Sequence, residues 1–444
     1  MKTVIIGGVA GGLTAASQIK RQDRDAEVIV LEKSGDVSYS ACGMPYNLFY
    51  RNHPVEELYA LSLETIRMKR GIDYRLRHEV VDIDAAKQLV SVVDRQQGRQ
   101  YRESYDYLVY ATGNRPVELP LPGFDDPTSF YFKTLDDTRR IKSLLHEKTP
   151  GRALLVGAGY TNLEMADVLY NMKVQPVIIE KAPTILPAFA QEIREKVLEK
   201  IVEKGIELHT GVDVVEKSGS VVLTSAGNFN ADLVVIAIGV KPNTALFGAA
   251  GGELGVAGAV KVDRCLRTTL PNVFAAGDCA EHYVRQLGRN GYMPLGPVAN
   301  KQGRLVGNNI VNSSDMKVFP GIDQTAAFKF FDLTIATTGL NERQLKELGS
   351  DYVNVFIDSP TRGAFTGGGT IRILLLCERG SGMLLGGQMV GQDVVAKRLD
   401  VLATAIYKKM TVFELAELDL SYAPPYAPVW DPLLVAANLA IKKV

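Results

Sequence analysis

The fold is decided by the stretch Thr3-Val4-Ile5-Ile6-Gly7-Gly8-Val9-Ala10-Gly11-Gly12. Its apolar half predicts a short buried strand over 3–6, and its glycines predict a tight turn into a helix over 13–21. A second strand follows over 26–31 and ends at Glu32. This order of strand, glycine turn, helix, strand and acid is typical of a dinucleotide-binding unit, in which backbone N–H groups at a helix N-terminus bind a pyrophosphate.

The same order occurs a second time in the chain. A strand over 153–156 precedes the turn Gly157-Ala158-Gly159-Tyr160-Thr161-Asn162, a helix over 163–172 and a strand over 176–179 that ends at Glu180. Val9 and Asn162 each occupy a glycine position of the motif, and a lone glycine turn can simply pack a strand against a helix. Two copies, each with its acid, predict two dinucleotide sites.

The rest of the chain continues this pattern and then changes. Apolar runs over 107–113, 233–239 and 272–278 are read either as returns to a nucleotide site or as buried parallel strands. From about residue 321 the pattern changes to Thr/Phe-rich strands, an apolar run over 371–376 and a helical stretch over 396–409, which favours an α+β third domain. We therefore predict an α/β fold with two Rossmann-like domains and an α+β C-terminal domain.

Composition narrows the classes of function. The 444 residues carry 50 Lys and Arg against 50 Asp and Glu, so no overall charge favours nucleic acid or an anionic membrane. No apolar run reaches the roughly 18 residues of a membrane span, and the chain leads straight into a strand without a signal sequence. Cys42, Cys265, Cys279 and Cys377 show no zinc or disulfide spacing. We expect a cytoplasmic protein without a metal site.

Cys42 is the strongest candidate for a reactive residue. It stands in Ser38-Tyr39-Ser40-Ala41-Cys42-Gly43-Met44-Pro45-Tyr46, shortly after the first nucleotide-binding unit and without a second cysteine nearby. A thiolate beside a redox cofactor can exchange electrons with a disulfide, a persulfide or a flavin. A buried structural cysteine is the alternative, and we adopt that interpretation for the other three thiols.

Taken together, these motifs resemble the flavin-dependent pyridine nucleotide-disulfide oxidoreductases over essentially the whole chain. Within them, the chain is similar to the single-cysteine branch of coenzyme A-disulfide reductases, NADH oxidases and peroxidases. The resemblance implies an FAD-binding domain over 1–116 and 243–320, interrupted by an NAD(P)-binding domain over 117–242. It also implies a C-terminal dimerisation domain over 321–444, and hence a homodimer.

The resemblance also implies which residues hold the cofactors. For FAD these are Gly7, Ala10, Gly11, Gly12, Glu32, Lys33, Ser38, Ala111, Thr112, Gly113, Gly277, Asp278, Pro294, Leu295 and Ala299. For NADH or NADPH they are Gly157, Gly159, Tyr160, Glu180 and Gly239. Glu164 would act near the nicotinamide, although an acid at the start of a helix can equally serve only the helix dipole.

Coenzyme A is the expected substrate or bound adduct. Ala10 stands where peroxidase and oxidase relatives usually have a histidine, and both the helix over 16–21 and the Ser38-x-x-x-Cys42 block look like coenzyme A-disulfide reductases. A solvated helix face is the alternative for the helix residues. The implied substrate-binding residues are Gln18, Lys20, Arg21 and Ser38. The first three would lie near the mouth of the site, where cationic donors could hold the phosphates of coenzyme A.

In the same subgroup, the C-terminal segment of one subunit reaches the cysteine site of its partner. Tyr422 and Tyr426 are therefore expected to contact the bound thiol, with interface packing as the alternative. Relatives often carry a further tyrosine in a stretch that here spans 362–369 and contains none. Polysulfide, persulfide or dioxygen is thus an alternative electron acceptor.

The resemblance implies that NAD(P)H binds on one flavin face, where the ring of Tyr160 moves aside, and that Cys42 receives electrons on the other. Cys42 would cycle through a mixed disulfide or persulfide. Glu180 favours NADH because its carboxylate repels a 2′-phosphate, whereas the ammonium of Lys181 tolerates NADPH. Two other functions stay open: an NAD(P)H oxidase that reduces dioxygen, and a flavoprotein that serves as an electron-transfer or binding partner.

Overall fold

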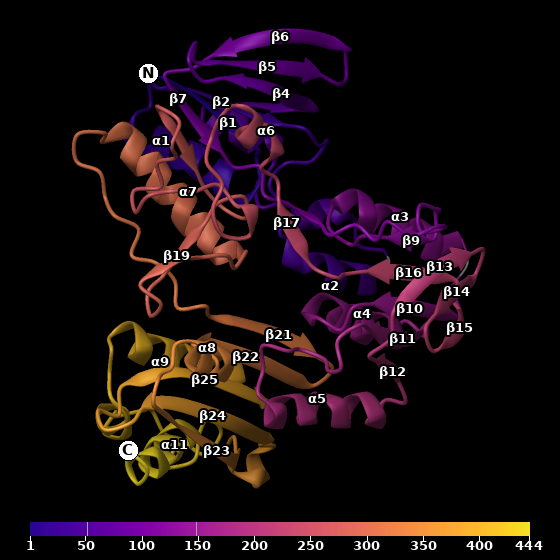
Figure 1. Ribbon diagram of the computed structural model, residues 1–444, viewed down its shortest axis with the longest axis vertical. Helices are drawn as coiled ribbons and strands as arrows, with labels where there is room; N and C mark the ends of the chain where they lie inside the picture. Colours follow the sequence, from indigo (N-terminus) through magenta and orange to yellow (C-terminus); the bar gives the residue numbers. More distant parts are fainter. Residues whose placement is uncertain (51, 148) are drawn as a thin grey trace. The chain divides into compact units, whose positions relative to one another are not determined.

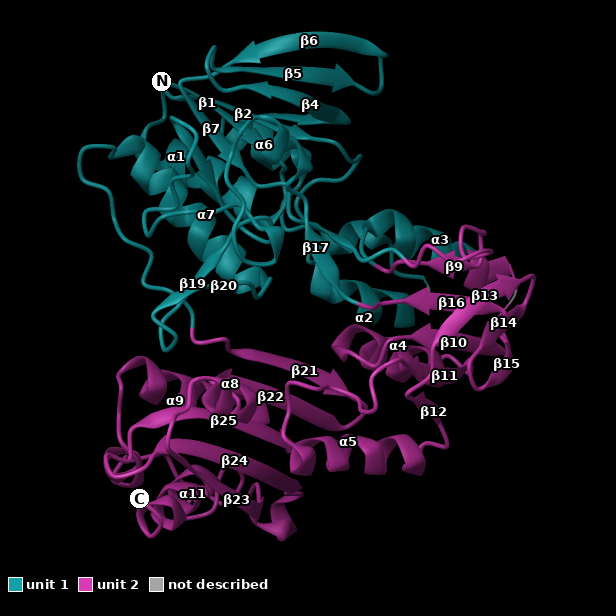
Figure 2. Ribbon diagram, in the orientation of Figure 1, with its two compact units in different colours: residues 1–118, 133–143, 239–322 teal, residues 119–132, 144–238, 323–444 magenta. Residues whose placement is uncertain are grey.

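The computed structural model describes residues 1–50, 52–147 and 149–444 (Figure 1). The chain forms two compact units (Figure 2). The first unit comprises residues 1–118, 133–143 and 239–322, and the second comprises residues 119–132, 144–238 and 323–444. Each unit therefore joins segments that lie far apart in the sequence.

A parallel five-stranded sheet organises the first unit. Its strands, in the order β18-β7-β1-β2-β3, are β1 (Lys2–Ile6), β2 (Glu27–Glu32), β3 (Asp73–Leu76), β7 (Tyr107–Tyr110) and β18 (Val273–Ala275). β1 is central and pairs in parallel with β2 and β7. The predicted strands over 3–6 and 26–31 are confirmed, and the runs over 107–113 and 272–278 contain buried parallel strands.

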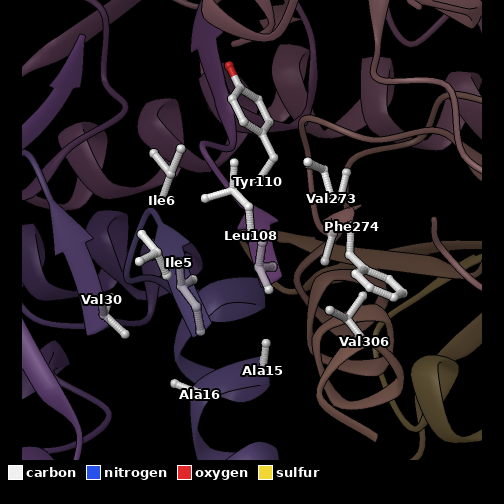
Figure 3. Close-up of a cluster of buried hydrophobic side chains, with 14 of the residues drawn as sticks. Ile5, Ile6, Ala15, Ala16, Val30, Leu108, Tyr110, Val273, Phe274 and Val306 are labelled. Carbon is white, nitrogen blue, oxygen red and sulfur yellow. The ribbon is translucent and has the colours of Figure 1, made fainter. Parts of the chain in front are cut away.

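Two long helices of the first unit pack closely against each other. α1 (Ala10–Gln22) follows the first glycine turn, and α7 (Gly296–Val311) crosses it. A Cβ atom at Gly303 of α7 would lie 2.2 Å from the carbonyl oxygen of Gly11, so glycine permits this approach. The core beneath combines apolar side chains of β1, β2, β7 and β18 with Ala15 and Ala16 of α1 and Val306 of α7 (Figure 3).

The remaining elements of the first unit are a second sheet, two strand pairs and several helical segments. An antiparallel sheet, which the sequence patterns did not predict, consists of β4 (His78–Asp84), β5 (Leu89–Asp94) and β6 (Arg99–Ser104). Two strand pairs are β8 (Asn114–Pro116) with β17 (Val240–Pro242), and β19 (His282–Val284) with β20 (Arg289–Gly291). The helical elements are η1 (Ala41–Gly43), α2 (Met44–Phe49), η2 (Val55–Leu58), η3 (Thr65–Lys69), α6 (Ala245–Ala249), η4 (Val256–Gly258) and the start of α3 (Leu135–Glu147).

A second parallel sheet forms part of the second unit. Its strands, in the order β12-β11-β10-β16-β9, are β9 (Ser129–Phe130), β10 (Arg152–Val156), β11 (Gln175–Glu180), β12 (Glu207–Thr210) and β16 (Leu233–Ile236). The helices α4 (Tyr160–Asn171) and α5 (Gln191–Glu203) accompany it, and β13 (Val214–Ser218), β14 (Val221–Thr224) and β15 (Gly227–Asn230) form a small antiparallel sheet. The predicted second strand, turn, helix and strand are confirmed.

The C-terminal part of the second unit is an antiparallel sheet with helices. Its strands, in the order β21-β22-β25-β24-β23, are β21 (Ala326–Phe330), β22 (Leu333–Gly339), β23 (Tyr352–Pro360), β24 (Thr370–Glu378) and β25 (Leu384–Gly391). The helices are α8 (Glu342–Glu347), η5 (Ala364–Thr366), α9 (Val395–Tyr407), α10 (Val412–Ala416) and α11 (Pro432–Ile441). α9 packs on β22 and β25, and α11 packs on β23 and β24. The predicted α+β character of this region is confirmed.

Polar contacts join the two parts of the second unit. Asp167 of α4 accepts a hydrogen bond from the N–H of Phe331 at 2.9 Å, and Lys200 of α5 pairs with Asp332 at 2.8 Å. Both partners lie in the turn between β21 and β22. These contacts help to explain why residues 323–444 belong to the same compact unit as residues 144–238. The separate domains expected over 117–242 and 321–444 stay a prediction.

No helix within the described ranges is both long and apolar enough to cross a membrane.

Candidate active site

Several of the residues predicted to bind FAD lie at one edge of the first sheet. β1, β2, β7 and β18 run parallel, so their carboxyl ends lie at the same edge. Gly7, Glu32, Ala111 and Gly277 stand at or just beyond those ends. Open α/β sheets bind ligands at this edge, and the topology therefore brings the predicted FAD residues together.

The glycine turn after β1 is tightly packed. Gly7 has a φ of +96°, and a Cβ atom there would lie 2.3 Å from the carbonyl oxygen of Ala111. A Cβ atom at Gly12 would lie 1.8 Å from the carbonyl oxygen of Gly7. Val9 is tolerated at its position because it is the N-cap of α1, with an ordinary negative φ of −81°. The turn thus requires glycine at 7 and 12 but not at 9.

The N-terminus of α1 is open to an anion. No side chain in the described part of the chain caps it, and its first turn, which begins at Ala10, contains no acid. Its first backbone N–H groups therefore point beyond the helix without a side-chain acceptor. A pyrophosphate is the kind of group that such a helix end binds.

Glu32 presents a nearly buried carboxylate beside this turn. Its Oε2 accepts a hydrogen bond from the N–H of Gly8, and its Oε1 accepts one from the N–H of Ser34, both at 2.8 Å. Each carboxylate oxygen keeps a second lone pair. Glu32 thus ties the glycine turn to β2 and can still accept a ribose hydroxyl, while the neighbouring Lys33 is exposed.

Asp278 lies at the end of the run that contains β18. The oxygens buried there would be stabilised by a further hydrogen-bond donor. Burial raises the pKa of Asp278, opposed by the positive charge of Lys133. The Nδ2 of Asn114 donates to its Oδ2 at 2.9 Å, and the buried Oδ1 of Asn114 has no partner among the described residues. Ligand hydroxyls here would reduce the cost of burying these oxygens. The turn, the helix end and the two acids together fit the pyrophosphate and hydroxyls of FAD.

The start of α7 faces the same edge. Leu295 is the N-cap of α7, and Pro294 precedes it. A Cβ atom at Gly277 would lie 3.4 Å from the Cβ of the buried Ala299. The hydroxyl of Thr112 donates to the backbone carbonyl of Asn243, and the side-chain amide of Asn243 donates to the backbone carbonyl of Thr112, which fixes the backbone that leads to Gly113.

Cys42 lies in the short helical turn η1, directly before α2, in the first unit. It is exposed, whereas Cys279 and Cys377 are buried, Cys265 is half-buried, and no disulfide joins any of the four. Burial raises the pKa of the thiols of Cys279 and Cys377 to about 11, so both are protonated at neutral pH. Cys42 is therefore the thiol best placed to react with a molecule from solution.

A network of polar contacts holds the segment that carries Cys42. The nearly buried Asp36 accepts hydrogen bonds from both terminal nitrogens of Arg139, at 3.0 and 2.6 Å, and from the hydroxyl of Tyr59 at 2.6 Å. Tyr39 and Tyr59 also form an antiparallel β-bridge. Burial acts to raise the pKa of Asp36, but the hydrogen bonds from Arg139 and Tyr59 outweigh it and lower that pKa. Sequence patterns do not reveal this network, because 103 positions separate Asp36 from Arg139.

The residues predicted to bind coenzyme A have different surroundings. Gln18 is buried in α1, and its Oε1 accepts a hydrogen bond from the exposed Arg21 at 2.8 Å. The ammonium of Lys20 donates to the backbone carbonyls of residues 24 and 26, in the connection to β2. Ser38 is buried four residues before Cys42. The structure thus pairs Gln18 with Arg21, and the substrate role of all four residues stays a prediction.

The predicted NAD(P)H site occupies the carboxyl edge of the parallel sheet in the second unit. Gly157 follows β10 with a φ of +98°, and Gly159 is the N-cap of α4, whose first turn has neither a side-chain cap in the described residues nor an acid. Glu180 accepts hydrogen bonds from the N–H groups of Ala158 and Ala182, at 2.7 Å each. This arrangement repeats that of Glu32, so the residues fit a second pyrophosphate and ribose.

Three other positions of this site have informative surroundings. Asn162, at the third glycine position, is buried, and its Nδ2 donates to the carbonyls of residues 156 and 157 at 2.8 Å, which ties the helix to the turn. Tyr160 is 55% exposed. Glu164 is the fifth residue of α4 and so lies beyond the first turn, where the helix dipole acts most strongly. Gly239 belongs to the first unit and has a φ of +119°.

Aromatic residues are exposed on the C-terminal part of the second unit. Tyr422 and Tyr426 are 54% and 72% exposed, and Trp430 is 64% exposed. The turn η5 lies against the same segment, because Arg362 and Thr366 donate to the carbonyls of residues 425 and 424. Phe365, in η5, is 85% exposed. We call residues 422–430 together with Phe365 the C-terminal aromatic segment.

Comparison with known proteins extends these observations. Three curated relatives match over nearly their full length. A protein of Methanocaldococcus jannaschii named NADH oxidase is 33% identical over 100% of this chain and 99% of its own. A Pyrococcus horikoshii protein named NAD(P)H coenzyme A polysulfide/persulfide reductase is 34% identical over 99% and 98%. A coenzyme A disulfide reductase of Staphylococcus aureus is 30% identical over 96% of both chains.

The fold and the family are also clear from solved structures and family models. The NAD-dependent persulfide reductase of A. fulgidus superposes with a TM-score of 0.95 and 37% identity, over 100% of this chain and 83% of its own. The model of the pyridine nucleotide-disulphide oxidoreductases matches residues 1–303, and that of their dimerisation domain matches residues 325–432. The chain therefore belongs to the pyridine nucleotide-disulphide oxidoreductase family.

Proposed function

We propose that this enzyme reduces coenzyme A disulfide, or a related persulfide or polysulfide of coenzyme A, with NAD(P)H and FAD, through Cys42. The exposed thiol of Cys42, in the same unit as an edge that fits FAD and with no second cysteine near it in sequence, carries the proposal. The names of the P. horikoshii and S. aureus relatives support this class of substrate.

The proposed reaction balances without any further reactant. The thiolate of Cys42 attacks one sulfur of coenzyme A disulfide, a new S–S bond forms, and the other coenzyme A leaves as a thiolate. Two electrons from NAD(P)H, with one proton from solvent, then break the mixed disulfide, release the second coenzyme A and restore Cys42. FAD, when bound, supplies the chemistry that converts a hydride from NAD(P)H into an electron pair for a disulfide.

The chain's own residues position the reactants. The contacts of Asp36 with Arg139 and Tyr59 fix the segment around Cys42. Glu180 would accept from the ribose of NAD(P)H, and Tyr160 and Glu164 of α4 would lie at the nicotinamide. In the homodimer, Tyr422 and Tyr426 of one subunit would complete the cysteine site of the other and donate a proton to the leaving thiolate.

We assign each expected domain one role in the proposed reaction. Residues 1–116 and 243–320 would bind FAD, residues 117–242 would bind NAD(P)H, and residues 321–444 would form the dimer. The four thiols, none of them in a disulfide, favour the reducing cytoplasm as the compartment.

An NAD(P)H oxidase is the second candidate. Two observations favour it: the M. jannaschii relative is named NADH oxidase, and the stretch 362–369 exposes Phe365 where a phenol could have served as a proton donor. In that case dioxygen, rather than a coenzyme A disulfide, would take the electrons.

Substitution of Cys42 separates the two candidates. Under anaerobic conditions, Cys42→Ser should lower the rate of NADH consumption with coenzyme A disulfide by more than about a hundredfold, because the nucleophile is gone. Cys265→Ser, which changes a half-buried thiol, serves as the matched control and should keep the wild-type rate. An undiminished anaerobic rate in Cys42→Ser would refute the thiol cycle. Survival of only an oxygen-dependent rate would favour the oxidase.

A further inference from the structure

We infer that an ion pair between Lys181 and Asp213 makes the second dinucleotide site select NADH over NADPH. The inference rests on the proposed function, because it concerns the nicotinamide nucleotide that this site would bind. Asp213 lies 33 positions beyond Glu180, outside the strand, turn, helix and strand that mark the site. The sequence alone suggests that the ammonium of Lys181 tolerates a 2′-phosphate. In the structure, that ammonium pairs with Asp213 instead.

The backbone places Lys181 and Asp213 next to each other. Lys181 directly follows β11. On its two sides, the N–H of Val212 donates to the carbonyl of Glu180 at 3.0 Å, and the N–H of Gly211 donates to the carbonyl of Ala182 at 2.9 Å. The chain after β12 therefore runs alongside Lys181, and the Nζ of Lys181 lies 2.8 Å from Oδ1 of Asp213.

Asp213 is itself held in position. Its N–H donates to the hydroxyl of Ser225 at 3.0 Å, and the N–H of Ser225 donates back to its carbonyl at 2.9 Å. These bonds fix the backbone where the chain enters the β13–β14 hairpin. The contact with Asp213 raises the pKa of Lys181, so the ammonium stays charged at neutral pH.

The carboxylate of Glu180 indicates which ribose fits the site. Glu180 and Glu32 each accept from two backbone N–H groups in the same way, and each is followed by a lysine. The adenosine of FAD has an unmodified ribose, and the matching arrangement at Glu180 fits the unmodified ribose of NADH. A 2′-phosphate would meet two carboxylates, those of Glu180 and Asp213, and one ammonium that is already paired.

The pair is suited to substitution because the fold does not depend on it. The side chains of Lys181 and Asp213 are 82% and 58% exposed. An exposed pair contributes little to folding stability. Asp213→Asn should therefore fold like the wild type while it releases Lys181 and removes one negative charge.

Binding measurements on the FAD-loaded, full-length enzyme test the inference. Isothermal titration calorimetry should show that the wild type binds NAD⁺ more tightly than NADP⁺. Asp213→Asn should tighten NADP⁺ about tenfold, the effect of one charge-assisted hydrogen bond, and should change NAD⁺ by less than about twofold. The gain should shrink with added salt, because the new contact is exposed. In steady state, the KM for NADPH should fall while kcat stays the same.

The double variant Lys181→Ala/Asp213→Asn is the matched control. It should lose the gain in NADP⁺ binding, because the released ammonium is absent. Equal affinities for NAD⁺ and NADP⁺ in the wild type, no gain in Asp213→Asn, or the same gain in the double variant would each overturn the inference. If nucleotide binding follows the expectation but no coenzyme A disulfide is reduced, the proposed function fails and the inference on selectivity stands.

Discussion

At the scale of single residues, the four thiols differ in their surroundings. Cys42 is exposed, Cys265 is half-buried, and burial raises the pKa of Cys279 and Cys377 to about 11. Iodoacetamide at pH 7.5 should therefore label Cys42 first, Cys265 more slowly and the two buried cysteines hardly at all. Peptide mapping by mass spectrometry measures this order, and denatured protein, in which all four should react, is the control. Labelling of Cys279 as fast as that of Cys42 would contradict the assignment.

Asp36 links the Cys42 segment to a pH dependence of stability. The pKa of Asp36 is lowered in the folded protein, so its ionised form contributes fully to stability above the unfolded value of about 4. This contribution is lost as the pH falls below that value and through the lower pKa of the folded state. Asp36→Asn should lower the free energy of unfolding by about 1–3 kcal/mol at pH 7 and by less near pH 3. Thermal unfolding at both pH values measures the difference. Asp125→Asn, at an exposed site, should have no effect, and an equal loss at both pH values would argue against the linkage.

Sequence patterns predicted the residues whose roles follow from their immediate neighbours in the sequence. The glycines of both turns, Glu32 and Glu180 follow a local order, and the structure places them at strand ends as that order requires. The contact of Asp36 with Arg139 could not be predicted, because it depends on how residues 133–143 return to the first unit. Asn162 departs from the motif, yet its side-chain amide donates to the carbonyls of residues 156 and 157, where the turn begins. Only the structure shows this compensation.

At the scale of elements, the crossing of α1 and α7 depends on small residues. Gly303→Ala would place a Cβ atom 2.2 Å from the carbonyl oxygen of Gly11, so the helices must separate, at a cost of about 1–3 kcal/mol. Chemical denaturation measures this loss, and the FAD content after purification should fall with it. Gly296→Ala in the same helix is the control, since its Cβ atom would have no neighbour within 4 Å. Equal stability of the two variants would show that the crossing tolerates a methyl group.

The elements that could be predicted are those with a strong apolar pattern. The strands β1, β2, β10 and β11 are nearly continuous apolar runs, and each ends at a glycine turn or an acid. The antiparallel sheet of β4, β5 and β6 was not predicted, because β4 and β6 include many charged residues and β5 alternates buried with half-buried residues, so none of them is a continuous buried run. Such strands are defined by their pairing partners rather than by local hydrophobicity.

At the scale of the whole molecule, the family's dimerisation domain indicates a homodimer. The C-terminal aromatic segment is the surface we assign to the partner, because it exposes several large apolar side chains. Trp430→Asp should shift the protein from dimer towards monomer in sedimentation velocity, and should lower turnover of coenzyme A disulfide with it. Val202→Asp, at a 78% exposed position of α5, should stay dimeric. An unchanged dimer in Trp430→Asp would place the interface elsewhere.

The central claim is that the thiol of Cys42 forms a mixed disulfide with coenzyme A. Mass spectrometry of the intact protein tests this claim most directly. After incubation with coenzyme A disulfide in the absence of NAD(P)H, the wild-type chain should gain the mass of one coenzyme A moiety, and a thiol reductant should remove it. Cys42→Ser should gain nothing under the same conditions. An unmodified wild-type chain, or an equal adduct on Cys42→Ser, would contradict the account.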